Sequence, residues 1–305
     1  MTLRQWLLLV ATAASFASSV VINKILIGQL PPFTLAAMRV LLAAPVAFSL
    51  LLLFNRELPA RGPDRRTVLY AALGVIVIPY CALAIGQQSI PSGLSGILYS
   101  TMPLFTLVAA HFILHDEQLG ARKLIGIGLG MAGVVAVIGP SLLGGFGAHA
   151  KGELITLCGP LAYAVGMVLM RRSKHIDPIA LTAAMFIVAA CILLPIALVL
   201  EQPWRLRGGW GTFGWLMAMA TIGTIAPAAL NYLLVQRVGA TRASIGMFLM
   251  PLIAVLFGAV FLGERLQFSA FVGMALILAG SVAVNGINRS VLRGFGAGPA
   301  GATVH

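Results

Sequence analysis

The sequence predicts an all-α integral membrane protein with ten transmembrane helices, and three observations carry this prediction. The chain has 305 residues, of which 60% are hydrophobic and only 9% are charged, whereas about 25% of the residues of a soluble domain are charged. Its apolar runs, such as LIGIGLGMAGVVAVIG at 124–139, lack the alternation of a transmembrane β-barrel. At ~20 residues per span, ten helices with short loops account for the length. A soluble enzyme, a disordered chain and a disulfide scaffold are thereby excluded.

Apolar segments separated by short breaks at Pro, Gly or Arg place the helices in order along the chain. The first segment has small residues that resemble a signal-peptide cleavage site, but nine further spans follow it and favour a retained helix. The Gly-rich residues 289–305 are expected to form a flexible tail. The predicted helices are 4–26, 33–54, 67–88, 91–114, 121–140, 151–171, 178–200, 211–236, 240–262 and 267–286.

The Lys and Arg residues predict the orientation of the bundle. Fourteen of the 20 would lie on the side of the N-terminus, the even-numbered loops and the C-terminus, five would lie on the other side, and Arg39 falls within the second helix. Since cytoplasmic loops are enriched in Lys and Arg, both termini are predicted to be cytoplasmic. The net charge of +12 therefore indicates membrane topology rather than nucleic-acid binding.

The chain also contains an internal repeat. Glu117 and Glu264 are 147 positions apart, and Pro32 and Pro178 are 146 apart. Three further identical pairs are 148 apart: Pro79 and Pro227, Gln88 and Gln236, and Pro103 and Pro251. The predicted halves, residues 1–145 and 146–288, hold five helices each. Because five is odd, the second half enters the membrane from the opposite side, which gives the inverted repeat typical of secondary transporters.

Paired strings in the two halves resemble a known family. MPLFTLVAAHFILHDEQL with GIGLGMAGVVAVIG, and MPLIAVLFGAVFLGERL with GMALILAGSVAV, are similar to the drug/metabolite transporter superfamily, EamA type, and most similar to its bacterial exporters of amino acids and related metabolites. The resemblance implies an exporter of the bacterial cytoplasmic (inner) membrane. It also implies a central cavity between the first, third, fourth, sixth, eighth and ninth helices, with the fifth and tenth at the edge. His111 and His115 depart from the pattern, since the matching second-half residues are Ala259 and Gly263.

No acidic residue is predicted in the middle of a span. All eight Asp and Glu residues fall at helix ends or in loops, whereas a proton-coupled carrier commonly keeps a carboxylate within a span. Transport is therefore predicted to be uncoupled, and coupling through another group such as a histidine is the alternative. His111 and His115 share a helix face that could hold Zn, and a third ligand is plausible, but the second half has no equivalent pair, so no metal is predicted. The chain has no P-loop, GxSxG, HExxH or CxxC motif, so neither a catalytic site nor a cofactor is predicted.

Polar and aromatic side chains on the presumed cavity helices are the candidate substrate contacts. Arg39 either faces a substrate carboxylate or pairs with backbone carbonyls, and Lys24 is expected to reach the membrane interface. Tyrosine offers a ring and a hydroxyl, which suits amino acids with apolar or aromatic side chains. Helix-to-helix hydrogen bonding is the alternative role of the amides and hydroxyls. The predicted substrate-binding set is Tyr80, Tyr99, Tyr163, Asn231, Tyr232, Arg39, His111, Asn23, Gln87 and Ser244.

Prolines and glycines predict the bending and packing of the helices. A proline within a helix removes a hydrogen bond and kinks the helix. A paired set of prolines is therefore predicted to kink the helices. The kinks either act as hinges that gate the two mouths of the cavity, or are static and shape the cavity. The glycines of the fifth and tenth helices are predicted to permit close packing, by default within one monomer. The proline set is Pro79, Pro103, Pro227 and Pro251.

The leading hypothesis is a secondary exporter of small amphipathic metabolites, most of all amino acids with apolar or aromatic side chains, that works by alternating access. A multidrug exporter of lipophilic cations would use the same tyrosines through cation–π contacts but lacks a buried acid. An integral-membrane enzyme would need a cluster of catalytic residues, and only the stretch around His115 comes close to one. A channel is the fourth hypothesis. The expected partners are a small-molecule substrate and the lipid bilayer, with no nucleic acid, and the expected state is a monomer or weak homodimer.

Overall fold

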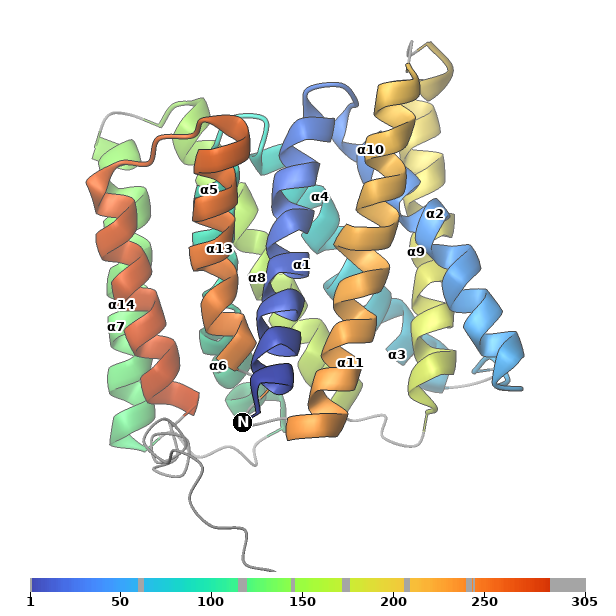
Figure 1. Cartoon of the computed structure of the whole chain (residues 1–305), viewed down its shortest axis with the longest axis horizontal. Coiled ribbons are helices and arrows are strands. Elements are labelled where there is room, and N and C mark those ends of the chain that lie inside the picture. The colour runs from blue at the N-terminus through green and yellow to red at the C-terminus, as the bar shows by residue number, and fades with distance from the viewer. Residues whose placement is uncertain are drawn as a thin grey trace, which may run out of the picture.

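The described part of the chain is a bundle of helices that run between two opposite ends of the molecule (Figure 1). The computed structural model describes residues 2–59, 63–114, 120–143, 146–171, 176–205, 209–239, 243 and 245–285, and these contain no strand. Eight helical segments are long and apolar enough to cross a membrane, and Gly246–Leu262 and Phe268–Val284 are shorter apolar helices. The all-α prediction is confirmed, and each of the ten predicted ranges coincides with a helical segment. The inverted relation of the halves stays a prediction.

The helix bounds agree with the predicted ranges to within about five residues, the usual uncertainty of helix ends read from sequence. In the first half they are α1 Leu3–Ile27, α2 Pro32–Leu53, α3 Pro63–Ala72, the π-helical segment η1 Leu73–Val77, α4 Ile78–Gly86, α5 Ser92–Tyr99, α6 Met102–Leu114 and α7 Ala121–Leu143. In the second half they are α8 Ala148–Arg171, α9 Pro178–Glu201, the 3-10 turn η2 Pro203–Arg205, α10 Trp210–Ala220, the π-helical segment η3 Thr221–Ile225, α11 Ala226–Val238, α13 Ile245–Leu262 and α14 Phe268–Asn285.

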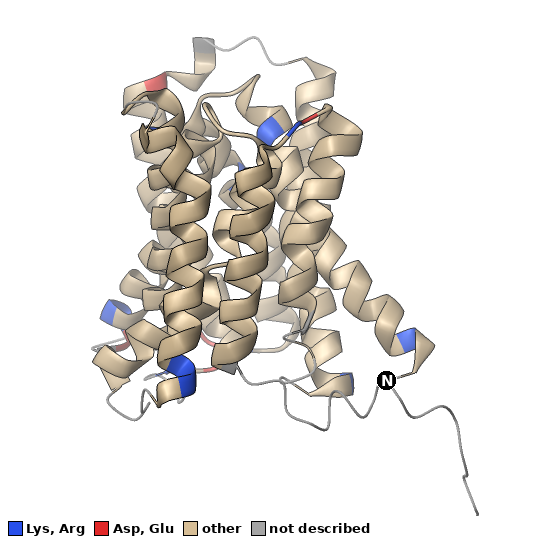
Figure 2. Ribbon diagram, turned by 90° about the vertical axis from the view of Figure 1, so that its left-hand side faces the viewer, with Lys and Arg blue, Asp and Glu red and all other residues tan. Residues whose placement is uncertain are grey.

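The outer surface of the bundle is apolar between its ends. Charged residues gather toward the two ends, and the band between them is largely uncharged (Figure 2). Large apolar side chains lie exposed on these helices, among them Val135, Phe112 and Val260. Such exposure is unfavourable in water and normal against lipid tails. The chain is thus a multi-pass membrane protein, and the cytoplasmic position of its termini stays a prediction.

Two helices are interrupted at positions related by the sequence repeat. The segments η1 and η3 begin at Leu73 and Thr221, which are 148 residues apart, and each ends two residues before Pro79 or Pro227. Because proline lacks the N–H that an α-helix needs, the preceding turn widens: Ile78 N bonds to Leu73 O, five residues back. The expected disturbance at these two prolines therefore takes the form of a π-helical turn.

The other two prolines differ from each other. Pro103 follows a break between α5 and α6, where the backbone turns at Ser100 and Thr101. Its partner Pro251 lies inside the uninterrupted helix α13. The first half therefore has a helix break before its proline, and the described part of the second half has no break at the matching position.

Each π-helical segment packs on the first helix of the other half. Residue Gly223 of η3 faces α1, where a Cβ on the glycine would lie 3.2 Å from the Ser19 Cα. Residue Gly74 of η1 faces α8, where a Cβ would lie 2.8 Å from the Gly166 Cα. Only glycine permits backbones to approach so closely. This reciprocal packing is what a two-fold relation between the halves requires.

The helices α7 and α14 lie side by side at one edge of the bundle (Figure 1). Their contact is made by glycines: a Cβ on Gly126 would lie 2.8 Å from the Gly280 carbonyl oxygen, and one on Gly133 would lie 2.7 Å from the Gly273 carbonyl oxygen. The predicted close packing of these two helices within one monomer is thus present. A substituent there would meet backbone, which cannot move aside as a flexible side chain can.

The two ends of the bundle differ in how tightly the helices meet. At the end where α1 finishes, called here the Lys24 end, α4 and α5 each contact both α1 and α8, and α13 packs on α5. At the opposite end, called the Arg4 end, α1 packs on α11 and α13, while α8 packs on α3 and α6. Within the described residues no comparably extensive contact joins α11 to α3, α6 or α8. The bundle is therefore joined at the Lys24 end and less closely joined at the Arg4 end.

We expect Gly133→Ala to destabilise the protein by about 1–3 kcal/mol, the usual cost of overpacking, because the new methyl group meets the Gly273 carbonyl. The measurement is the midpoint of thermal unfolding in detergent. Gly128→Ala is the matched control, since a Cβ on Gly128 of the same helix meets nothing within 4 Å. Equal midpoints for the two variants would contradict the packing described for α7 and α14.

Candidate functional site

A buried arginine connects both halves of the chain near the middle of the bundle. Arg39 of α2 is 6% exposed. Its Nη2 donates to the Ser19 hydroxyl of α1 at 2.9 Å and to the Gly223 carbonyl of η3 at 3.1 Å. Its Nε donates to the Thr224 hydroxyl of η3 at 3.0 Å. One side chain thereby joins α2 and α1 of the first half to the π-helical segment of the second.

The π-helical turn supplies the acceptors that Arg39 uses. In a regular α-helix the Gly223 carbonyl would accept from the N–H four residues later, but that residue is Pro227 and has no N–H, and Arg39 donates to this carbonyl instead. The Thr224 hydroxyl donates to the Met219 carbonyl at 3.0 Å, so its lone pairs are free to accept from Arg39. The Ser15 hydroxyl of α1 donates to the Ile222 carbonyl at 2.7 Å and holds η3 against α1.

An aromatic ring covers the guanidinium of Arg39. The Arg39 Cζ lies 3.8 Å from the centroid of the Tyr80 ring on α4, a cation–π arrangement of the kind that arginine favours. Tyr80 directly follows Pro79, the proline that comes two residues after the π-helical turn η1, so the turn and this ring are close neighbours along the chain. The Arg39 group therefore contacts parts of α1, α2, η3 and α4.

No carboxylate of the described residues lies within 4 Å of the Arg39 guanidinium. Its Nη1 has no hydrogen-bond partner in the described part of the chain. A buried charge without an opposite charge is costly in a low-dielectric interior, and an intramembrane cation is a functional-site candidate for that reason. The site can therefore accept an anion, and a carboxylate fits the guanidinium in a bidentate manner.

Two further tyrosines lie near this group. Tyr99 at the end of α5 is half-buried, and its hydroxyl donates to the Pro79 carbonyl at 2.7 Å. Tyr99 lies close enough to Arg39 and Tyr80, and Tyr163 of α8 close enough to Tyr80, for a charge on one group to act on the other. The Tyr99 ring rests against Gly159 of α8, where a Cβ would lie 2.8 Å from the tyrosine Cζ. The structure thus brings together Arg39, Tyr80, Tyr99 and Tyr163 of the predicted set, here called the Arg39 cluster.

Asn23 and Gln87 form a buried contact of their own. The Asn23 Nδ2 donates to the Gln87 Oε1 at 2.8 Å, and the Gln87 Nε2 donates to the Val20 carbonyl at 3.0 Å. Gln87 is 0% exposed and Asn23 is 2% exposed. In this conformation the two amides join α1 to the end of α4, which is the helix-to-helix role that the sequence left open as their alternative.

The remaining predicted residues lie apart from the Arg39 cluster. Tyr232 of α11 is 65% exposed, and His111 of α6 is half-buried and lies twelve residues beyond Tyr99, on the other side of the break between α5 and α6. Asn231 is half-buried one turn beyond Pro227 and has no hydrogen bond to the described residues. Ser244 and His115 lie outside the described residues. No group of three potential metal ligands occurs in the part of the chain that the structure describes.

Lys24 binds backbone carbonyls within the bundle at the Lys24 end. Its Nζ donates to the Gln87 carbonyl at 2.6 Å and to the Ile90 carbonyl at 2.8 Å, both in the turn between α4 and α5. The expectation that Lys24 reaches the membrane interface stays a prediction, since these contacts lie at the end of the bundle. The turn offers two carbonyls beyond the C-terminal end of α4, and a cation at a helix C-terminus satisfies them directly.

Two acids of the second half cap helices of the first half, a feature that the sequence did not predict. The Glu264 carboxylate accepts from Ser92 N at 2.6 Å and Gly93 N at 2.9 Å, at the start of α5. The Glu201 carboxylate accepts from Phe33 N at 3.0 Å and Thr34 N at 2.6 Å, at the start of α2. A signal was available in the sequence: both helices follow a proline, whose side chain cannot cap the exposed N–H groups.

Comparisons with known proteins agree with this architecture. A model of the EamA-like transporter family matches residues 4–139 and 150–286. The chain is 24% identical to the uncharacterized transporter YoaV of Bacillus subtilis, over 84% of this chain and 88% of that protein. It is 26% identical to the uncharacterized inner membrane transporter YedA of Escherichia coli K12, over 88% and 86%. It is 27% identical to a probable amino-acid metabolite efflux pump of Salmonella typhimurium, over 85% and 87%.

We expect Glu264→Ala to lower the stability of the protein by about 1–2 kcal/mol, the usual cost of removing a helix cap, because Ser92 N and Gly93 N lose their acceptor in a partly buried place. The midpoint of thermal unfolding in detergent measures the effect. Glu57→Ala, which removes an exposed acid that has no hydrogen bond or ion pair with the described residues, is the control. An unchanged midpoint for Glu264→Ala would show that the cap contributes nothing.

Proposed function

Because the chain belongs to the EamA-like transporter family, we propose that it is a secondary transporter of the inner membrane that exports small amphipathic metabolites. We further propose that its substrates are amino acids with apolar or aromatic side chains. Membership of a transporter family indicates transport rather than catalysis. The relatives named as an inner membrane transporter and as a probable amino-acid metabolite efflux pump support the location and the substrate class.

The observation that carries the substrate proposal is the uncompensated charge of Arg39. The guanidinium is 6% exposed, and no described acid is within 4 Å of it. A substrate carboxylate bound to Nη1 would supply the missing negative charge and form charge-assisted hydrogen bonds. The same charge disfavours the alternative of a lipophilic-cation exporter, because a cationic substrate would be repelled by it.

The tyrosines of the Arg39 cluster suit the other part of the substrate. Tyr80, Tyr99 and Tyr163 combine aromatic rings with hydroxyl groups, so they offer apolar area to a side chain and hydrogen bonds to its polar end. Asn231 lies about 10 Å further along the helix axis from Thr224, toward the Arg4 end. Its free amide would meet a substrate that approaches from that end.

Alternating access is the proposed mechanism. The described conformation is joined at the Lys24 end and less closely joined at the Arg4 end, which supports a state that receives substrate from the Arg4 side. If the termini are cytoplasmic, as the distribution of Lys and Arg predicts, this is the inward-facing state. The π-helical turns before Pro79 and Pro227 lie beside the Arg39 cluster and are the proposed points of bending.

We expect purified protein in proteoliposomes to catalyse saturable counterflow of one or more apolar or aromatic amino acids. Arg39→Lys keeps the charge but loses the planar pair of donors, so the half-saturation concentration should rise about 10- to 100-fold, as for a charge-assisted hydrogen bond of about 1.5–3 kcal/mol. The amide of the same amino acid, which lacks the carboxylate, should compete poorly with the wild type.

Arg56→Lys serves as the matched control, since Arg56 pairs with Asp177 at 3.4 Å on an exposed surface at the end of the same span. Its counterflow should equal that of the wild type. Failure of all twenty amino acids to exchange would overturn the substrate proposal. Flux that does not saturate would indicate a channel.

A further inference from the structure

A carboxylate is buried at the Lys24 end without full hydrogen bonding. Glu153 lies in the second turn of α8 and is 1% exposed. Its Oε1 accepts from the Ser141 hydroxyl of α7 at 3.1 Å, while its Oε2 has no partner. Within the described residues the only other buried side-chain oxygen without a partner is the Thr156 hydroxyl, one turn further along α8. Uncoupled transport was predicted because no acid lies in the middle of a span. Glu153 is not in the middle of a span either, but it is buried, as a proton-binding acid would be.

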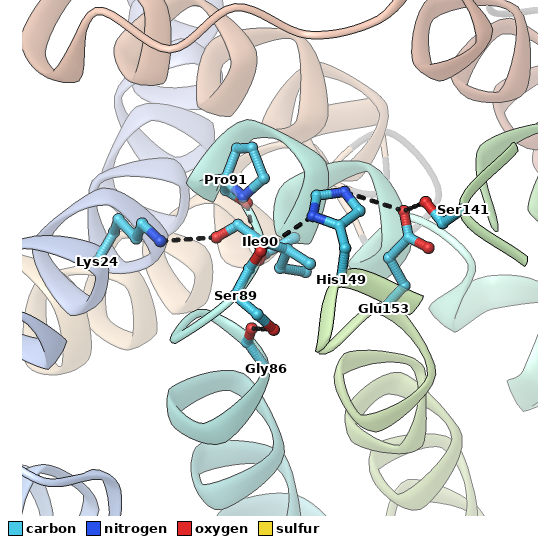
Figure 3. Close-up of polar contacts among 9 residues, drawn as sticks. Lys24, Gly86, Ser89, Ile90, Pro91, Ser141, His149 and Glu153 are labelled. Carbon is cyan, nitrogen blue, oxygen red and sulfur yellow. Dashed lines mark hydrogen bonds and ion pairs between the residues drawn. The ribbon is translucent and has the colours of Figure 1, made fainter. Parts of the chain in front are cut away.

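A histidine stands between Glu153 and the turn that joins α4 to α5 (Figure 3). His149 Nδ1 lies 3.0 Å from the Ser89 carbonyl oxygen, and Nε2 lies 3.6 Å from Glu153 Oε1. A carbonyl oxygen only accepts, so Nδ1 must carry a hydrogen. In a neutral ring Nε2 then presents a lone pair to the lone pairs of a carboxylate, which repel it. Both contacts are favourable together only when one additional proton resides on Nε2 or on the Glu153 carboxyl group.

Few other charges act on this pair. From α7 it meets the Ser141 hydroxyl, and from the α4–α5 turn it meets the Ser89 carbonyl. Lys151 on the same helix is exposed, with its Nζ 5.9 Å from the Phe146 ring centroid. The charged groups of the other elements packed here are Lys24 of α1, which binds the Gln87 and Ile90 carbonyls, and Glu264, which caps α5. Neither of these two contacts Glu153.

The same turn is held by the residues that close the Lys24 end. Lys24 binds it from the side of α1 and His149 binds it from the side of α8 (Figure 3). The backbones of α4 and α8 also meet here, since a Cβ on Gly152 would lie 2.9 Å from the Gly86 carbonyl oxygen. The His149 side chain is 48% exposed, so a proton from the adjacent aqueous phase can reach it while Glu153 stays buried.

We propose that His149 and Glu153 form a proton-binding site, and that the bound proton stabilises the state in which the Lys24 end is closed. The proton enters from the solution at that end and is held between Nε2 and Oε1. Its departure leaves a neutral imidazole facing a buried carboxylate, which weakens the contact with Ser89 and favours a state in which water reaches Glu153. The proposal rests on the proposed transport function, to which it adds coupling or control by protons.

The test is the distance between spin labels at Gly28 and Gly147, which lie at the end of α1 and just before α8 and are both exposed. The labels are attached to cysteines at these positions, with Cys81, Cys158 and Cys191 replaced by serine. Distances are measured by pulsed electron paramagnetic resonance in lipid nanodiscs without substrate, from pH about 5.5 to about 8.5, which brackets the ordinary histidine pKa of ~6.5. We expect a short-distance population at low pH and a growing long-distance population at high pH, with the ratio changing up to about tenfold per pH unit for one proton.

Glu153→Gln should remain in the short-distance state at all pH values, because its amide donates to Nε2 without a titrating proton. His149→Gln is the second variant, since it retains a donor for the Ser89 carbonyl and leaves Glu153 as the only titrating member of the pair. The pH at which the two populations are equal should therefore differ from that of the wild type. Lys151→Gln, an exposed change in the same turn, should follow the wild type. A wild-type distribution that does not change with pH, or a shift that persists in Glu153→Gln, would overturn the proposal. A shift that follows the replacement of K⁺ by Na⁺ at constant pH would assign the site to sodium instead.

The experiment is independent of the proposed substrate, because no substrate is present. A pH-dependent distance together with no amino-acid exchange would retain the proton site and overturn the substrate proposal. Amino-acid counterflow together with a distance that ignores pH would do the reverse. If both proposals hold, counterflow by the wild type should depend on pH and counterflow by Glu153→Gln should not.

Discussion

The position of one guanidinium constrains the centre of this bundle. Arg39 contacts Ser19 of α1, the Gly223 carbonyl and Thr224 hydroxyl of η3, and the Tyr80 ring of α4. Each contact needs a particular local structure: a π-helical turn to offer acceptors, and a proline after the turn to maintain it. A buried charge that is hydrogen-bonded but has no counter-ion is tolerated only where another requirement keeps it. Under the proposed function that requirement is the substrate carboxylate.

The second constraint lies at the Lys24 end, where ends of helices must be buried against each other. Unsatisfied N–H and C=O groups would be costly there, and side chains from other elements satisfy them. Glu264 and Glu201 cap α5 and α2, and Lys24 takes the last carbonyls of α4. All three interactions depend on the apposition of separate helices. An opening of this end would therefore break charged hydrogen bonds, and it would need water or new partners to replace them.

The helices could be predicted from the sequence, but the contacts between them could not. Continuous apolar runs and the repeated prolines predict ten helical segments because hydropathy and proline act locally. Arg39 and the tyrosines Tyr80, Tyr99 and Tyr163 were predicted as candidates because charge and aromatic rings within a span are unusual. The roles of Lys24 and Glu153 could not be predicted in the same way. Both lie near helix ends, where charge is normal, and only the packing of α4 and α5 against them shows that they are enclosed.

The two halves of the sequence repeat differ at the positions of the Arg39 cluster. At the spacing of 146 that relates Pro32 to Pro178, the counterpart of Arg39 is Met185, which is 4% exposed. At the spacing of 148, Tyr80 and Tyr99 correspond to Ala228 and Met247. A second buried guanidinium would repeat the desolvation cost, and one carboxylate could not compensate both charges. Arg39 and two of the three tyrosines of the Arg39 cluster therefore belong to the first half, whereas the second half contributes Tyr163 and the acceptors in η3, and the π-helical turns occur in both. In the proposed mechanism the paired turns would let the two ends open alternately, and the single charge would fix how the substrate is oriented in either state.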